Sequence, residues 1–216
     1  MCAKRLALAL VTRVARRRYN STSSLINVSP AAVEDAASLT ITESFISNSE
    51  QQQLMKEVEL SMGRKKYNFD HWDDAIHGYK ETEKTEWSRD NQPVITRLQS
   101  AVGSRDLLLP HIHVLDLSND GYIKPHVDSV KFCGRIIAGV SLLSSCVMRL
   151  QHEQDKHKWI VMLLPPLSVY IIRDVTRYQY THEILADDVS YHRGQKIDRE
   201  RRVSLICRTK PQSSLL

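Results

Sequence analysis

Apolar residues recur at helical spacing in two segments of the first half of the chain. The first segment, residues 49–62, places its apolar side chains on one helical face, and Ser49 followed by Gln52 resembles a capping box at its start. The second segment begins near Pro93, a residue favoured in the first turn of a helix. The apolar positions of the two segments are Leu54, Met55, Val58 and Met62, and then Val94, Ile95, Leu98 and Val102. The pattern predicts two amphipathic helices.

From residue 108 onward the pattern changes to short runs typical of β-strands, with turn signals at residues 119–121 (Asn-Asp-Gly) and at Pro165-Pro166. The runs cover residues 111–117, 122–128, 136–143, 147–152, 158–164, 167–173 and 203–208. Residues 64–90 mix charged and aromatic side chains without a clear period, so we expect an irregular segment with one short strand. Two helices followed by many short strands predict an α+β, mainly β fold, in which an antiparallel sandwich or barrel is buttressed by the N-terminal helices.

Length and composition indicate a single globular domain, and the scattered cysteines indicate a reducing compartment. The chain has 216 residues, of which 42% are hydrophobic and 25% charged, and these values are ordinary for one globular domain. The four cysteines are scattered and form no CxxC pair, which argues against both a disulfide framework and a structural zinc site.

The positive charge of the chain is concentrated at its N-terminus. Residues 1–33 contain six Lys and Arg and no acidic residue; removing these six from 30 leaves 24 basic against 25 acidic residues. The body is therefore not a generally basic, phosphate-binding protein. The Arg-rich, acid-free leader is typical of a mitochondrial presequence, although a disordered basic tail is the alternative. We expect a presequence over 1–33, a domain over 34–210, a tail over 211–216, and import into the mitochondrial matrix.

Transmembrane segments are not expected, because the apolar run Leu6–Val11 is far shorter than the roughly 20 residues that span a bilayer. The chain is expected to be a monomer.

One pair of residues indicates metal chemistry. His126 and Asp128 stand two apart at the end of a predicted strand, so both side chains point to the same face and can reach one ion. Two imidazoles and one carboxylate on one face of an octahedron form the site of non-haem Fe(II) oxygenases, with three positions left open. An H-x-D pair alone is weak evidence, since a surface polar pair has the same spacing.

Three later residues strengthen this interpretation. His182 follows as a further imidazole donor, and Arg202 with Ser204 follows on one face of the last predicted strand. A fixed guanidinium beside a hydroxyl suits a carboxylate. This order and spacing resemble the double-stranded β-helix (jelly-roll) oxygenases, in which iron binds a 2-oxo acid and an arginine binds its distal carboxylate.

The last strand makes the resemblance more specific. Residues 202–208, RVSLICR, form an R-x5-R sequence that resembles the signature of the AlkB family of Fe(II)/2-oxoglutarate-dependent dioxygenases. The phrases GYIKPHVDSVKFCG (121–134) and SVYIIR (168–173) are also similar to this family, and the likeness extends over about residues 38–210.

The resemblance implies roles for individual residues. It makes His126, Asp128 and His182 ligands of Fe(II), and it makes Arg202 and Ser204 the site of the 2-oxoglutarate 5-carboxylate. Two further residues are implied to lie at the cosubstrate pocket, each with a plainer alternative: Tyr170, otherwise a half-buried sheet tyrosine, and Arg208, otherwise a surface arginine. The implied reaction consumes 2-oxoglutarate and O2, releases succinate and CO2, and hydroxylates or demethylates a substrate.

The substrate is left open between classes. Nucleic-acid demethylases of the family often carry Asn-x-Tyr where this chain has His113-Val-Leu115, and the body is not basic, so duplex DNA is not expected. We expect a macromolecular substrate, with protein favoured. A mitochondrial RNA (tRNA) demethylase is the alternative, and a metal-binding regulatory module with little turnover is the second alternative.

Other polar residues receive ordinary interpretations. His111 and His113 are predicted to be plain strand positions. A basic cluster before the last strand is interpreted as a solvated loop; its members are Arg193, Lys196, Arg199 and Arg201.

Overall fold

The computed structural model describes residues 24–69 and 75–211. Most of the predicted presequence (1–33) and C-terminal tail (211–216) lies outside these residues. Residues 24–33, which the expected presequence included, belong to the fold. The strand β1 (Ile26–Val28) pairs with β7, and the Leu25 side chain is buried. A domain boundary at residue 33 would therefore remove a strand from the sheet.

The described residues form one large antiparallel sheet and three α-helices. The helices are α2 (Asn48–Met62), α3 (Gln92–Val102) and the short α4 (Asp174–Tyr178). The strands are β1 (Ile26–Val28), β2 (Leu39–Thr42), β3 (Ile76–Lys84), β4 (Ile112–His126), β5 (Ile136–Leu142), β6 (Cys146–His152), β7 (Trp159–Leu164), β8 (Val169–Arg173), β9 (Tyr180–Ile184), β10 (Tyr191–His192), β11 (Gln195–Lys196) and β12 (Arg202–Arg208).

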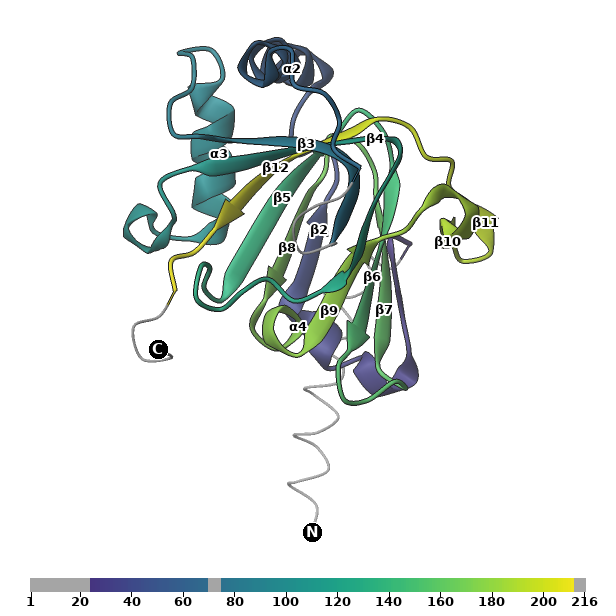
Figure 1. Cartoon of the computed structure of the whole chain (residues 1–216). Coiled ribbons are helices and arrows are strands. Elements are labelled where there is room, and N and C mark those ends of the chain that lie inside the picture. The colour runs from purple at the N-terminus through teal and green to yellow at the C-terminus, as the bar shows by residue number, and fades with distance from the viewer. Residues whose placement is uncertain (1–23, 70–74, 212–216) are drawn as a thin grey trace.

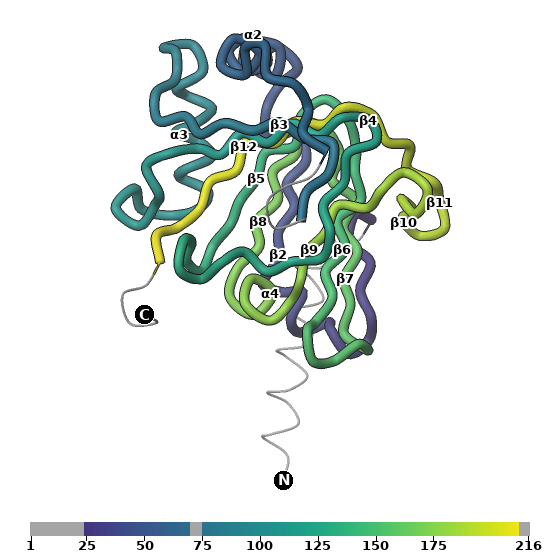
Figure 2. The backbone as a smooth tube through the Cα atoms, in the orientation of Figure 1, coloured from purple at the N-terminus to yellow at the C-terminus, as the bar shows by residue number. Residues whose placement is uncertain are grey.

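The sheet order places the strands of the candidate site next to one another. The order is β1-β7-β6-β9-β4-β12-β5-β8-β2, with β3 added on β4 and with β10–β11 as a separate hairpin. The sheet curls around its interior while α2 and α3 lie together against its outside (Figure 1). The tube view shows the same curl, with β3 running beside β4 (Figure 2). The prediction of a mainly β, jelly-roll fold with N-terminal helices is confirmed.

Two apolar layers explain this arrangement. One fills the interior of the curled sheet and includes Leu150, Met162 and Tyr180, all fully buried. The other lies between the sheet and the helices, where Leu54 and Leu98 pack in one cluster with strand residues. Along β12 the alternate residues Val203, Leu205 and Cys207 belong to this outer layer. The residues between them, Arg202, Ser204, Ile206 and Arg208, therefore face the interior.

The start of α2 differs from the prediction by two residues. The N-cap is Ser47, whose Oγ accepts a hydrogen bond from the Glu50 backbone amide while the Glu50 carboxylate accepts one from the Ser47 amide. The capping box predicted from Ser49 and Gln52 was therefore wrong, because the carboxylate of Glu50 closes the motif two residues earlier. The predicted second helix from Pro93 is confirmed as α3.

Residues 119–121 do not reverse the chain. The single strand β4 runs through them, where two strands separated by a turn were predicted, and residues 118–121 bulge opposite Gly78 of β3. Gly78 has φ +62°, and Ser118 Oγ donates to its carbonyl oxygen at 2.9 Å. Turn residues at this place therefore mark a β-bulge. Its partner β3 is a nine-residue strand, longer than the short strand expected in 64–90.

None of the helices within the described ranges is long and apolar enough to cross a membrane.

The carboxylate of Asp35 ties the N-terminal segment to the sheet and gives a pH prediction. Tyr180 Oη donates to Asp35 Oδ2 at 2.7 Å, and Lys158 Nζ donates at 2.9 Å. Burial alone would raise the pKa of Asp35, but these two donors outweigh it and lower the pKa of this carboxyl below its usual value. A depressed folded-state pKa stabilises the fold above the unfolded-state pKa, and this stability is lost as the pH falls through the folded-state value.

We expect Asp35→Asn to lower the free energy of unfolding by about 1 kcal/mol at pH 7, because one charge-assisted pair is weakened. The difference from the native chain should shrink as the pH falls from 5 toward 3. Urea unfolding of both chains across this range measures it, with the exposed Asp188→Asn as the control. A difference that stays constant with pH would contradict the assignment.

Candidate metal and cosubstrate site

Two histidines meet across neighbouring strands. His126 is the last residue of β4, and His182 lies in the middle of β9. The two strands are antiparallel, and the register places these residues directly opposite each other. Their imidazole ring centroids are 4.3 Å apart. Because cross-strand neighbours on one face are close, the sheet itself brings the two rings together although they are far apart in the sequence.

Asp128 completes the donor set from the loop that follows β4. Its Oδ1 lies 3.3 Å from His126 Nε2 and 3.7 Å from His182 Nε2. One ligand atom from each of the three residues lies within 4.8 Å of the others. The strand ends at His126, so Asp128 reaches the site from a loop and not from the strand predicted over 122–128. Two imidazole nitrogens and one carboxylate oxygen on one side of a point are the donors that suit non-haem Fe(II).

The protonation states of these groups suit a metal. His126 Nδ1 lies 2.9 Å from the Lys124 carbonyl oxygen, which places the proton on Nδ1 and leaves the Nε2 lone pair available. Burial, reinforced by His126, lowers the pKa of His182 to about 3, so its ring is neutral near pH 7. Burial alone would raise the pKa of Asp128, but the Arg208 guanidinium and the two histidines hold it well below 3.8.

The second oxygen of Asp128 is held by the protein. Arg208 Nε donates to Oδ2 at 2.8 Å, and the Cys133 thiol lies 3.7 Å from the same oxygen. Arg208 Nη1 also donates to His113 Nδ1 at 3.1 Å, and His113 Nε2 lies 2.7 Å from Glu81 Oε2. This chain of contacts leaves Oδ1 directed at the two histidines. The interpretation of His113 as a plain strand position was therefore wrong.

The Arg208 contact predicts a measurable loss of metal affinity. We expect Arg208→Met to weaken Fe(II) binding about 10- to 100-fold, because groups that orient a ligand from outside the first coordination shell typically contribute this much. Titration with Fe(II) under anaerobic conditions measures the affinity. The exposed Arg135, which pairs with Asp174 on the surface, supplies the control Arg135→Met. Equal affinity in both variants would mean that Arg208 does not orient Asp128.

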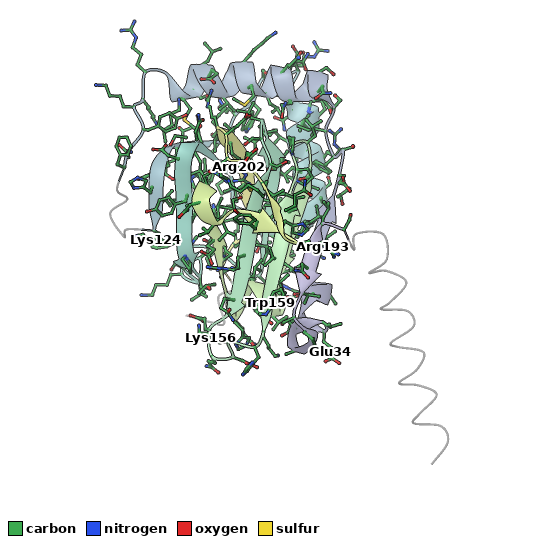
Figure 3. All side chains as sticks on the ribbon, turned by 90° about the vertical axis from the view of Figure 1, so that its right-hand side faces the viewer. Glu34, Lys124, Lys156, Trp159, Arg193 and Arg202 are labelled. Carbon is green, nitrogen blue, oxygen red and sulfur yellow. The ribbon has the colours of Figure 1, made fainter. Side chains whose placement is uncertain are left out.

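A buried guanidinium lies within the curled sheet. Arg202 is 2% exposed and lies among the strands, whereas Lys156 and Arg193 lie at the periphery (Figure 3). Its Nε donates to Ser141 Oγ at 3.2 Å, but its Nη2 has no hydrogen-bond partner in the part of the chain that the structure describes. The buried Ser204 Oγ on the same strand face also has none. A buried donor without a partner is costly, so these atoms fit a bound carboxylate such as that of 2-oxoglutarate.

Tyr170 lies beside this group on β8. Its side chain is 4% exposed, and burial raises the pKa of its hydroxyl. The ring lies over Gly139, its cross-strand partner on β5, and a Cβ at Gly139 would stand 2.4 Å from the tyrosine oxygen. Glycine is therefore required there for the ring to lie flat inside the sheet. Both residues predicted for the cosubstrate from resemblance, Tyr170 and Arg208, lie in the interior.

Comparison with known proteins decides the family. The model of the 2OG-Fe(II) oxygenase superfamily matches residues 71–208. The chain belongs to this superfamily. It is 48% identical to the Bos taurus protein named alpha-ketoglutarate-dependent dioxygenase alkB homolog 7, mitochondrial, over 83% of this chain and 81% of that protein. It is 44% identical to the Mus musculus protein of the same name, over 97% of this chain and 92% of that protein.

Solved structures of low sequence identity share the fold of this superfamily member. OsALKBH1 superposes with a TM-score of 0.58 at 12% identity, covering 79% of this chain and 97% of that one. A Pseudomonas putida prolyl-4-hydroxylase superposes with a TM-score of 0.53 at 11% identity, over 84% and 98%. The predicted AlkB-type dioxygenase is confirmed, as are Fe(II), 2-oxoglutarate and O2 as its cofactor and cosubstrates. Membership of an enzyme superfamily disfavours the regulatory module without turnover.

The burial of several polar residues near the site was not predicted from the sequence. Arg177 on α4 is 2% exposed and donates to the carbonyl oxygens of Gly134 and Cys133, which fixes the loop after Asp128. The interpretation of the basic cluster as a solvated loop was wrong for two members: Arg199 is 7% exposed, and Arg201 makes two hydrogen bonds to Asp116. No periodic pattern marks these positions, because each is buried by tertiary contacts of loops and strand ends.

Proposed function

We propose that His126, Asp128 and His182 bind Fe(II) and that Arg202, Ser204 and Tyr170 bind 2-oxoglutarate in this dioxygenase. Two observations carry the proposal: two Nε2 atoms and one Oδ1 converge, and the buried Arg202 Nη2 has no hydrogen-bond partner among the described residues. When bound, the metal and 2-oxoglutarate would allow O2 to oxidise a C–H bond of the substrate, and 2-oxoglutarate would be released as succinate and CO2.

The protein side chains position the reactants. Arg208 and the Cys133 thiol hold one oxygen of Asp128, which directs the other oxygen at the histidines. Arg202 binds the far carboxylate of the cosubstrate and so fixes the direction of its 2-oxo end. Arg202, Ser204 and Tyr170 are buried, and an electrostatic contact made away from water is stronger than the same contact at the surface.

We infer a mitochondrial location, in the matrix. Both mammalian relatives are named mitochondrial, and the Arg-rich, acid-free residues 1–18 are typical of an imported leader. Cleavage is proposed before Leu25, since β1 and the buried Leu25 belong to the sheet. The mature domain would then begin near residue 24 and not at 34, the boundary expected from the sequence.

A protein substrate is favoured by the charge near the metal site. Glu81 and Glu83 lie on β3, with side chains 36% and 65% exposed. Glu81 is linked through His113 and Arg208 to Asp128, so its carboxylate lies close to the metal-binding loop, on a strand that also carries Lys80 and Lys84. Carboxylates at this position repel a phosphate backbone and attract a basic or neutral polypeptide.

RNA is the second candidate because of one aromatic arrangement. Phe69, which is 57% exposed, lies with its ring centroid 5.6 Å from that of His77, and His77 stacks on Tyr122 at 5.1 Å. Exposed stacked rings can bind unpaired bases. The neighbouring Tyr79 is buried in the interior core and is not available to stack on a base, and Trp72 lies outside the described residues.

The two substrates are separated by comparing mitochondria that contain the native chain with mitochondria that contain Asp128→Ala. Mass spectrometry of proteins and of tRNA nucleosides is carried out on the same samples. We expect the differences to be confined to protein hydroxylation or methylation. Differences confined to methylated nucleosides would replace the protein proposal with the RNA one, and no difference in either would reject a macromolecular substrate. His157→Ala, at an exposed histidine, is the matched control.

A further inference from the structure

Arg199, in the loop before β12, is a second buried guanidinium near Arg202. The residue is only 7% exposed. Nη2 donates to the Gly121 carbonyl oxygen at 3.0 Å, whereas Nε and Nη1 are buried without a hydrogen-bond partner. Arg202 Nη2 and Ser204 Oγ are likewise buried and without a partner. Four polar atoms of these three residues thus have no acceptor or donor among the described residues.

Arg199 and Arg202 both lie against the same stretch of β4. Arg202 is near enough to Arg199 to lower the pKa of Arg199, in addition to the larger effect of burial. The buried Cys146 on β6 raises the pKa of Arg199. Gly121, to which Arg199 donates, lies at the bulge of β4, whereas Leu117 of β4 pairs with Arg202.

No protein carboxylate forms an ion pair with either guanidinium within the described part of the chain. Asp187 accepts a hydrogen bond from the backbone amide of Arg199, and not from its side chain. Two buried cations close together repel each other and lose hydration, which is costly unless an anion lies between them. A carboxylate has two oxygens with about four lone-pair positions, enough for donors from two guanidiniums and a hydroxyl.

We propose that Arg199 is a second guanidinium of the cosubstrate site and that it binds, with Arg202 and Ser204, the distal carboxylate of 2-oxoglutarate. This inference rests on the proposed function of Arg202 and Ser204. A purely structural Arg199 would need only the one donor that reaches Gly121, and would leave two buried donors without any use. With the anion bound, those donors and Arg202 Nη2 gain acceptors.

The test is calorimetric binding to the full-length protein loaded with Mn(II), which replaces Fe(II) without turnover. Two ligands are compared: 2-oxoglutarate, and 2-oxopentanoate, which has the same chain length but a methyl group in place of the distal carboxylate. We expect Arg199→Met to weaken 2-oxoglutarate binding about 10- to 100-fold, the size of a lost hydrogen bond between charged groups. Binding of 2-oxopentanoate should change less than about twofold, and Arg199→Lys should restore part of the loss, because a lysine keeps the charge without the fork.

The control is Arg193→Met, which removes another loop arginine that donates to a backbone carbonyl, that of Ile26 at 3.0 Å. This variant should leave the affinity ratio of the two ligands unchanged. If Arg199→Met also leaves the ratio unchanged while Arg202→Met lowers it, Arg199 is structural and this inference is rejected. If neither Arg199→Met nor Arg202→Met changes the ratio, the proposed cosubstrate site itself is wrong. If Arg199→Met lowers thermal stability without changing the affinity ratio of the two ligands, Arg199 has only a structural role.

Discussion

Replacing His126 by alanine is expected to reduce succinate formation from 2-oxoglutarate by more than about 100-fold, because a side chain that binds the metal directly contributes more than the groups that orient it. His126 supplies one of the three converging donors, and water cannot substitute for a donor fixed by the sheet. The anaerobic complex with Fe(II) and 2-oxoglutarate should also lose the weak visible charge-transfer band expected for this family. Both measurements use the same protein preparation.

The fold should survive this substitution. The His126 side chain is 28% exposed and lies at the end of β4, so its loss does not leave a buried charge without a partner. Circular dichroism and the unfolding temperature should match those of His157→Ala, which removes an exposed histidine far from the donor set. A charge-transfer band that persists in His126→Ala under full metal loading would contradict the proposed ligand set.

Some of the site could be predicted from the sequence because it depends on strand periodicity alone. Arg202, Ser204 and Arg208 stand an even number of residues apart, so any strand over 202–208 places them on one face. The apolar residues between them then direct that face inward, since Val203 and Leu205 pack under the helices. Local pattern was sufficient here because one strand carries all three functional groups.

The rest of the site depends on contacts between distant segments. Cys133, His113 and Arg199 reach the interior from a loop, a strand face and a second loop, and nothing local in the sequence distinguishes them from ordinary polar positions. The strand β9 that carries His182 was not among the predicted runs, because its sequence Tyr-Thr-His-Glu-Ile is too polar for a core strand. Its polarity follows from the site, since His182 and Glu183 take metal-site and ion-pair positions.

The outer contacts of Asp128 explain how one loop residue acquires a fixed orientation. A carboxylate on a loop would rotate freely, but Oδ2 is held by Arg208 from β12 and by Cys133 from its own loop. Arg177 in turn donates to the Cys133 sulfur at 3.1 Å, so α4 supports the same loop. The metal-binding geometry therefore rests on three separate elements of the fold and not on the H-x-D spacing alone.

Neighbouring arginines at the start of β12 should show opposite effects when each is replaced by methionine. Arg202 faces the interior and has no protein carboxylate as partner, as far as the described residues show. We expect Arg202→Met to weaken 2-oxoglutarate binding by about 100-fold or more, because a guanidinium–carboxylate pair in a water-excluded pocket is the strongest contact available to the distal carboxylate. Its free energy of unfolding should not fall, since the substitution removes a buried charge and leaves no opposite charge alone.

Arg201 has the reverse role. It donates to both oxygens of Asp116, which is fully buried, at 3.1 and 2.6 Å, and it pairs with Glu59 of α2 at 2.7 Å. Arg201→Met should lower the free energy of unfolding by about 2–3 kcal/mol, because a buried carboxylate loses its bidentate partner. Lys80 and Tyr67 still contact Asp116, which limits the loss. Binding of 2-oxoglutarate to the folded fraction should change less than about twofold, since Arg201 does not face the interior.

The pair of variants separates cosubstrate binding from stability with side chains one residue apart. Urea unfolding gives the stability of each variant, and calorimetry with 2-oxoglutarate on the Mn(II)-loaded protein gives its affinity. If both variants lost stability and affinity together, the two arginines would act through a common structural effect, and Arg202 would have no specific role. A loss of affinity in Arg202→Met alone requires that this buried guanidinium binds the cosubstrate, since no contact with another charged group of the described protein explains its burial.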